Sequence, residues 1–162
     1  MGRYINDGIL RWFWVTTLSN PPAPSAVQVN AGVELTPFTV TTPDFPQSGS
    51  TADASDIGSA FNKTVPGTYG GDKATATMYL DREDLDNEAW DTFERLDEGY
   101  AVVFPYGVTG SQPGSGDRAD VYRCTVITKQ RQATARNDTA RFTLELSIDE
   151  EPLMDVTLVA GS

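Results

Sequence analysis

Short stretches of alternating apolar and polar residues recur along the chain, and a period of two predicts β-strands, because successive strand side chains point to opposite faces. The clearest stretch is 139–149. Its apolar set is Phe142, Leu144, Leu146 and Ile148, and its polar set is Arg141, Thr143, Glu145 and Ser147. Residues 72–80 alternate in the same way. Residues 120–132 are predicted to pair with 139–149 as a long hairpin that turns near 135–138.

The strand predicted at residues 10–16 is unusual because both of its faces are largely apolar. Leu10, Trp12 and Trp14 share one face, and Arg11, Phe13 and Val15 share the other. Such a strand is covered on both sides, or it packs one face in its own core and the other against a neighbouring subunit. Trp12 and Trp14 are therefore candidates for contacts between subunits. An exposed pair of tryptophans would instead suit stacking on a sugar ring.

One helix is predicted, over residues 85–98. Its apolar stripe consists of Leu85, Ala89, Phe93 and Leu96 and is widened by Trp90. Asp84 suits the N-cap and Gly99 the C-terminal stop. Further strands are predicted at 100–106 and 155–159, with one or two extended pieces over 26–42. The pattern favours a mainly β fold, an antiparallel β-sandwich or barrel with one flanking helix and long polar loops.

The longest predicted loop covers residues 43–59, which are rich in Ser, Asp, Gly and Pro. A loop of this length in a compact domain is commonly functional. Phe45, Asp53 and Asp56 lie on it. Asp53 and Asp56 alone do not supply enough converging oxygens for a calcium site.

The amino-acid composition argues against several classes of function. The chain has 162 residues, 39% of them apolar, and it carries 23 acidic and 12 basic side chains for a formal net charge of −11. A protein that grips nucleic acid presents a basic surface to the phosphates, so that class is not favoured. The sequence has no histidine and a single cysteine, Cys124, which excludes Ser-His and Cys-His catalysis and an intramolecular disulfide. We expect no catalytic residue, no cofactor and no metal site.

The N-terminal apolar run at residues 9–15 contains Arg11 and is too short to span a bilayer. It also lacks the order of charge, apolar stretch and cleavage site that marks a signal peptide. We therefore expect a soluble, intracellular protein with no membrane partner.

Charge is segregated along the chain. Residues 81–98 hold nine acids and two bases, a net −7, whereas residues 123–141 hold five bases and one acid, a net +4. Complementary surfaces of this kind favour contacts between copies, and Arg131 and Arg136 are then candidate contacts. The alternative is that the two segments neutralise each other within one subunit.

Several segments resemble the major tail (tail tube) proteins of long-tailed, non-contractile bacteriophages. The segments are 5–15, 29–36 and 72–81, a helix that ends Phe-Glu-Arg-Leu-Asp-Glu-Gly99, and a closing strand hairpin. The resemblance rests on pattern and on the order of elements over nearly the whole chain, because this family has no catalytic signature.

The resemblance implies a structural protein of the virion tail that is assembled in the host cytoplasm. Hexameric rings of such proteins stack into a tube around the tape-measure protein, and DNA later passes through the tube. Tail terminator and tail-tip proteins are then further partners. It also implies a single domain over residues 1–162, with segment 1–24 and loop 43–59 as assembly contacts. Phe45, Asp53 and Asp56 of this loop are then candidate contacts between subunits.

The polar strand faces are the candidate lining of the lumen of such a tube. The candidate residues are Thr75, Thr77, Thr143 and Glu145. The alternative function is a ligand- or carbohydrate-binding β-sandwich, for which Trp12 and Trp14 should be exposed.

Overall fold

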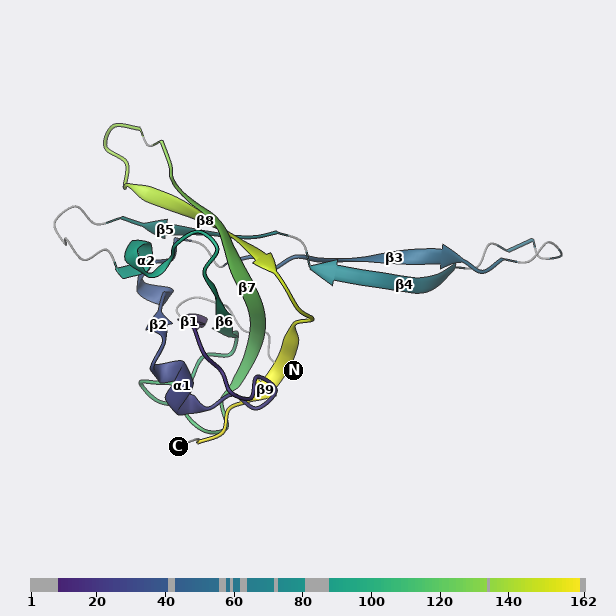
Figure 1. Ribbon diagram of the computed structural model, residues 1–162, viewed down its shortest axis with the longest axis horizontal. Coiled ribbons are helices and arrows are strands. Elements are labelled where there is room, and N and C mark those ends of the chain that lie inside the picture. The colour runs from purple at the N-terminus through teal and green to yellow at the C-terminus, as the bar shows by residue number, and fades with distance from the viewer. Residues whose placement is uncertain are drawn as a thin grey trace.

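The structure is a computed structural model that describes residues 9–40, 43–55, 58, 60–61, 64–71, 73–80, 88–133 and 135–160. Within these residues the body is a seven-stranded antiparallel sheet that curls into a half-barrel, and the fold is mainly β as predicted (Figure 1). The sheet order is β2-β1-β6-β7-β8-β5, and β9 pairs with β7. The strands of this sheet are β1 (Arg11–Val15), β2 (Val33–Glu34), β5 (Ala74–Tyr79), β6 (Glu98–Phe104), β7 (Arg118–Arg131), β8 (Arg141–Ile148) and β9 (Leu153–Thr157).

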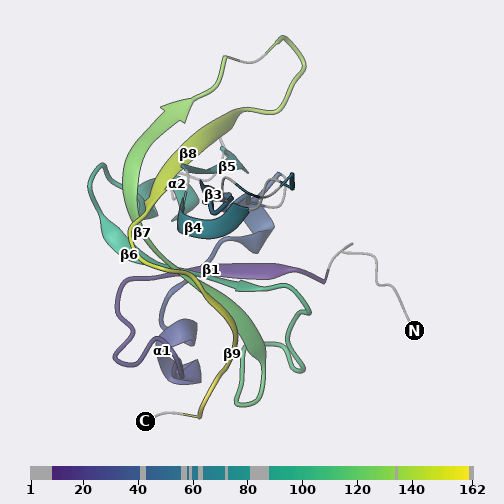
Figure 2. The same ribbon diagram turned by 90° about the vertical axis from the view of Figure 1, so that its right-hand side faces the viewer.

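Two apolar cores lie on opposite faces of this sheet, and β1 contributes to both. Trp12 and Trp14 belong to the larger core, which also includes Phe93, Phe142, Leu144 and Leu146. Phe13 and Val15 belong to the smaller core, which is covered by the helix α1 (Ala26–Asn30) through the buried residues Ala26 and Val29 (Figure 2). The two apolar faces of β1 are therefore both covered within one chain, which is the first of the two alternatives that its sequence left open.

The long hairpin is confirmed. Strands β7 and β8 pair from Cys124↔Ile148 to Arg131↔Phe142, with an irregularity between Val126 and Thr128. At the turn, the Asp138 amide donates to the Ala135 carbonyl at 3.1 Å. Asn137 has a φ of 71° there, which suits a residue type that tolerates the left-handed region better than most.

The predicted helix at residues 85–98 is wrong in its second half. The helix α2 ends at Thr92, and the chain then bends into β6, which begins at Glu98. The bend occurs at Leu96, which has a φ of 74° and whose amide donates to the Val126 carbonyl at 2.8 Å. Pairing with β7 replaces the last helical turns. The predictions for Leu85 and Asp84 lie outside the described residues.

Gly99 is a strand residue and does not terminate a helix. It lies in β6, and a Cβ atom at this position would come within 2.7 Å of Cζ2 of the Trp14 ring. The indole occupies the space that any other residue would need, so the glycine is explained by core packing.

Two further sequence predictions are corrected. Residues 26–42 do not form only extended pieces, because Ala26 and Val29 lie one helical turn apart and bury together on α1; the 3₁₀-helix η1 (Thr36–Phe38) follows it. Residues 43–59 are not one long loop. Part of this segment forms β3 (Gln47–Asp53), which pairs with β4 (Thr64–Gly71) as a separate two-stranded sheet. This sheet, which we call the arm, projects far from the body (Figure 1).

Candidate assembly surfaces

The four lumen candidates lie together on one polar face. The register of β5 and β8 places Thr75 opposite Glu145 and Thr77 opposite Thr143, on the side of the sheet away from the larger core. The Glu145 carboxylate accepts hydrogen bonds from Lys73 Nζ at 3.0 Å and from Thr128 Oγ1 at 3.2 Å. The hydrogen bond from Lys73 is the main reason that the pKa of Glu145 is lowered.

Basic groups on this face have acidic partners. Lys73 pairs with Glu145. The Arg123 guanidinium lies 3.5 Å from a Glu98 oxygen and 3.7 Å from a Glu150 oxygen. These exposed pairs contribute little to stability. They do lower the positive charge that this face presents, which makes it a poor surface for holding phosphates.

Arg131 is engaged inside its own chain. The irregularity in β7 places Lys129 and Arg131 opposite Leu144 and Phe142, on the side where α2 lies. Each cationic group sits 4.2 Å from the centroid of the Trp90 ring, and Lys129 Nζ also donates to the Trp90 carbonyl at 2.9 Å. Lys129 and Arg131 therefore contact α2 of their own subunit through Trp90 and not through its acids. An ion pair between Arg123 and Glu98 joins the basic segment to the acidic one.

Arg136 differs from Arg131. It lies in the exposed turn between β7 and β8, and no ion pair joins it to another described residue. Of the two arginines predicted as contacts, Arg136 is the one that the fold leaves available to another molecule.

Trp12 and Trp14 are core residues, and Phe45 is partly covered. Trp12 is 0% and Trp14 2% exposed, and Trp12 Nε1 donates to Thr39 Oγ1 at 2.7 Å. Phe45 is half-buried and stacks on Tyr122 with 4.2 Å between ring centroids. The prediction that Trp12 and Trp14 contact a neighbouring subunit is wrong, because both rings are enclosed in the core of their own chain. The same burial removes the exposed tryptophan platform on which the carbohydrate-binding alternative depended. For the half-buried Phe45 the contact stays a prediction.

The arm carries the remaining candidates. Every residue of β3 and β4 is exposed. Asp53, the last residue of β3, accepts a hydrogen bond from the Ser55 amide at 2.9 Å, which lowers the pKa of its carboxyl group. Asp56 lies outside the described residues. The sequence hid the arm because Pro66 and three glycines in β4 are residue types that argue against a strand.

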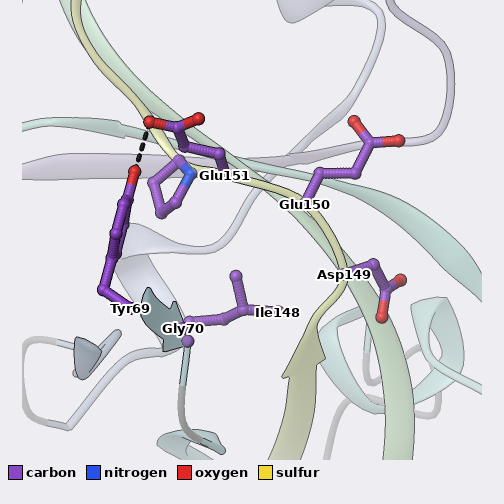
Figure 3. Close-up of a pocket in the computed structure, with 8 residues that line it drawn as sticks. Tyr69, Gly70, Ile148, Asp149, Glu150 and Glu151 are labelled. Carbon is purple, nitrogen blue, oxygen red and sulfur yellow. Dashed lines mark hydrogen bonds between the residues drawn. The ribbon is translucent and has the colours of Figure 1, made fainter. Parts of the chain in front are cut away.

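A groove of about 430 Å³ lies where the arm joins the body (Figure 3). The Tyr69 hydroxyl donates to a Glu151 carboxylate oxygen across it, and this bond raises the pKa of the tyrosine. At its floor Gly71 packs so closely on Ile148 that a Cβ atom would lie 2.7 Å from the Ile148 Cβ. These contacts tie β4 to the end of β8 and to the segment that follows it. Asp149 and Glu150 complete the acidic wall.

Neither a metal site nor a membrane span is found in the part of the chain that the structure describes. No three His, Cys, Asp or Glu side chains are grouped there so that they could hold a metal ion. Among the same residues no helix has the length and apolar character needed to cross a membrane.

The buried thiol gives a prediction for alkaline pH. Burial raises the pKa of Cys124 from 9.0 to about 12, so between these values the unfolded chain loses a proton that the folded chain keeps. The free energy of unfolding should therefore be nearly unaffected by this group below pH 9 and fall as pH rises from 9 towards 12, by roughly 3 kcal/mol at pH 11. Urea denaturation at pH 8, 9.5 and 10.5 measures this slope.

The control for this prediction is Cys124→Ala. The variant should be less stable at pH 8 because it leaves a small cavity, but its stability should fall less steeply above pH 9. Tyr122, whose pKa burial raises to about 12, maintains part of the slope in both proteins. Identical slopes in the two proteins would contradict the assignment to the thiol.

Three comparisons place the chain among known proteins. A family model described as phage tail tube protein matches residues 1–161. No curated protein matches. Among solved structures, a chain of the sixfold-symmetrised baseplate of the anti-feeding prophage matches with a TM-score of 0.59 and 10% identity, covering 93% of this chain and 95% of that one.

Two further chains share the fold. A chain of the tube-terminating cap of the anti-feeding prophage has a TM-score of 0.55 and 13% identity, with 92% of this chain and 90% of that chain covered. A tail chain of an empty gene transfer agent particle, refined with C6 symmetry, has a TM-score of 0.51 and 11% identity, with 93% and 98% covered. At such identities the likeness concerns the fold, whereas the family model covers nearly the whole chain. The chain belongs to the phage tail tube protein family.

Proposed function

We propose that the chain is the building block of the tube in a long, non-contractile phage tail. Six copies form a ring, the rings stack, and the tube conducts DNA during ejection. In this proposal residues 1–162 act as one domain in the virion tail after assembly in the host cytoplasm. The family membership supports the tube role, and the resemblance of the N-terminal segments supports the non-contractile class.

The observation that carries this proposal is the arm. Its strands have seven and eight residues, all exposed, and they form a separate two-stranded sheet with no buried face. A two-stranded hairpin alone in water is marginally stable. A segment of this size that the body does not cover suits contacts with another copy of the chain, in a neighbouring ring.

The polar face supports the role of a conduit. Thr75, Thr77 and Thr143 present hydroxyl groups there, and Lys73 is paired with Glu145. A lumen lined in this way offers DNA no array of unpaired cations, so the DNA is not retained by phosphate contacts. The tape-measure protein before ejection, and terminator and tip proteins at the tube ends, are the partners that the proposal requires.

Electron microscopy of the purified protein over a range of concentrations tests the proposal. We expect rings or tubes of uniform diameter with sixfold symmetry in end views. Arg136→Glu reverses a charge at the exposed turn and should reduce tube formation, whereas Arg95→Glu, with the same change of charge on the connection between α2 and β6, should not. A wild-type protein that remains monomeric at every concentration would refute the proposal.

A further inference from the structure

We infer that the arm joins a second copy of this chain through the backbone edge of β3, by adding β3 as a strand beside a strand of that copy. The inference rests on the proposed function, because it requires that copies assemble. It goes further by naming which of the two edges of the arm makes the contact.

The outer edge of β4 lacks a backbone hydrogen-bond donor at Pro66. Pro66 lies opposite Thr51 in the β3–β4 ladder. Proline has no N–H, so these two residues cannot form a pair that exchanges two backbone hydrogen bonds. They form the other kind of antiparallel pair, in which the backbone groups of both residues point away from the partner strand. Pro66 therefore places a residue without a donor on the outer edge of β4, a device that prevents strand addition.

The same pairing leaves backbone hydrogen-bonding groups of β3 directed away from β4. Because Thr51 belongs to that pair, its N–H and C=O groups also point outward, along the free edge of β3. Asp53 is two residues further along, so its backbone groups point the same way. Both residues are exposed, and unpaired backbone donors and acceptors on an exposed strand are a template for another strand.

Contacts at the root of the arm also distinguish the two strands. Tyr69 binds Glu151, and Gly71 packs on Ile148, and all four residues line the groove beside the body (Figure 3). These anchoring contacts are made by β4. They fix the arm to its own subunit through β4 and leave β3 as the strand directed to another molecule.

The edge strands of the curled sheet, β5, β2 and β9, offer no comparable edge. Among the described strands β9 pairs only with β7, and it has five residues and is interrupted at Asp155, where φ is 52°. The outer side of β5 is covered, since the Val40 amide donates to the Thr77 carbonyl at 2.9 Å and Asp44 and Thr75 exchange two hydrogen bonds of 3.3 Å. At the other end β2 has only two residues. Of these edges, that of β3 is the longest, with seven residues and a change of register between Gly49 and Thr51.

Thr51→Pro is the matched test. This substitution places a proline on β3 directly opposite Pro66 of β4. It removes no hydrogen bond inside the arm, because the Thr51 amide points outward. We expect a folded monomer whose critical concentration for tube formation rises by roughly tenfold or more, because one edge bond is lost and the ring of proline obstructs its neighbours. Thr51→Ala keeps the amide and should form tubes like the wild type.

Hydrogen exchange on the wild-type protein gives a second measurement that needs no variant. On assembly, the amides of Thr51 and Asp53 should become protected relative to the monomer. If these amides exchange equally fast in tubes and monomers, or if Thr51→Pro forms tubes at the wild-type concentration, the inference is overturned while the tube function stands. A wild-type protein that never assembles overturns both.

Discussion

Replacing residues 49–69 by Asn-Gly is expected to give a folded protein that no longer forms tubes at any accessible concentration. The cut is made at Ser48 and Gly70, which lie directly opposite each other in the β3–β4 ladder, and Asn-Gly forms a tight two-residue hairpin turn between paired strands. Apart from the Tyr69–Glu151 hydrogen bond, which is exposed, the deletion removes no contact that we have assigned to the body. Electron microscopy and sedimentation measure the loss of assembly.

Thermal unfolding is the control for this deletion. Both cores lie in the body, so the melting temperature of the shortened monomer should remain within a few degrees of the wild-type value. Tyr69→Phe, which removes only the hydroxyl contact with Glu151, should assemble normally. Tubes of normal diameter and length from the shortened protein would show that the arm is not an assembly element.

Much of the sheet is predictable from the sequence because its strands have one apolar and one polar face. In β8 the buried residues are Phe142, Leu144 and Leu146, with Thr143 and Glu145 between them on the other side. A period of two is sufficient where one face meets the core and the other does not. The lumen candidates follow from the same rule, since their grouping needs only the correct pairing of β5 with β8.

The arm and the end of the helix are not predictable in this way, because tertiary contacts determine them. The arm buries no side chain, so no apolar pattern marks its strands, and Pro66 fits only because its missing N–H faces outward. Phe93 keeps the apolar spacing of the helix and is fully buried, yet the helix ends at Thr92. The backbone bond from Leu96 to Val126 prevails over local helix propensity.

Tertiary contacts also decide which of the predicted subunit contacts are buried in their own chain. An apolar residue on a strand is equally suited to a core and to an interface, and sequence alone did not decide between them for Trp12 and Trp14. Exposure decides it, because the two tryptophans are enclosed by their own chain. Charge patterning proposed Arg131 and Arg136 alike. The fold places the Arg131 guanidinium over the Trp90 ring, whereas the contact of Arg136 with another subunit stays a prediction.

Trp14→Ala should destabilise the monomer by about 3–5 kcal/mol, the usual cost of removing a large buried aromatic side chain. The ring of Trp14 is 2% exposed and packs edge-on against Phe93 with 5.0 Å between centroids. It also lies against Gly99, so its removal leaves a cavity bordered by β6 and by the residue that follows α2. The loss is comparable with the whole stability of many domains of this size. Urea denaturation of dilute, monomeric protein measures it.

Tyr106→Ala is the control, because this aromatic residue is 59% exposed and its truncation should change stability by less than about 1 kcal/mol. Trp14→Phe should fall between the two variants, since it keeps part of the apolar volume. The comparison separates the two roles that sequence allowed for the tryptophan. If Trp14 were a contact between subunits, Trp14→Ala would leave monomer unfolding unchanged and impair only assembly, whereas a core residue lowers monomer stability first and tube formation follows from the loss of folded protein.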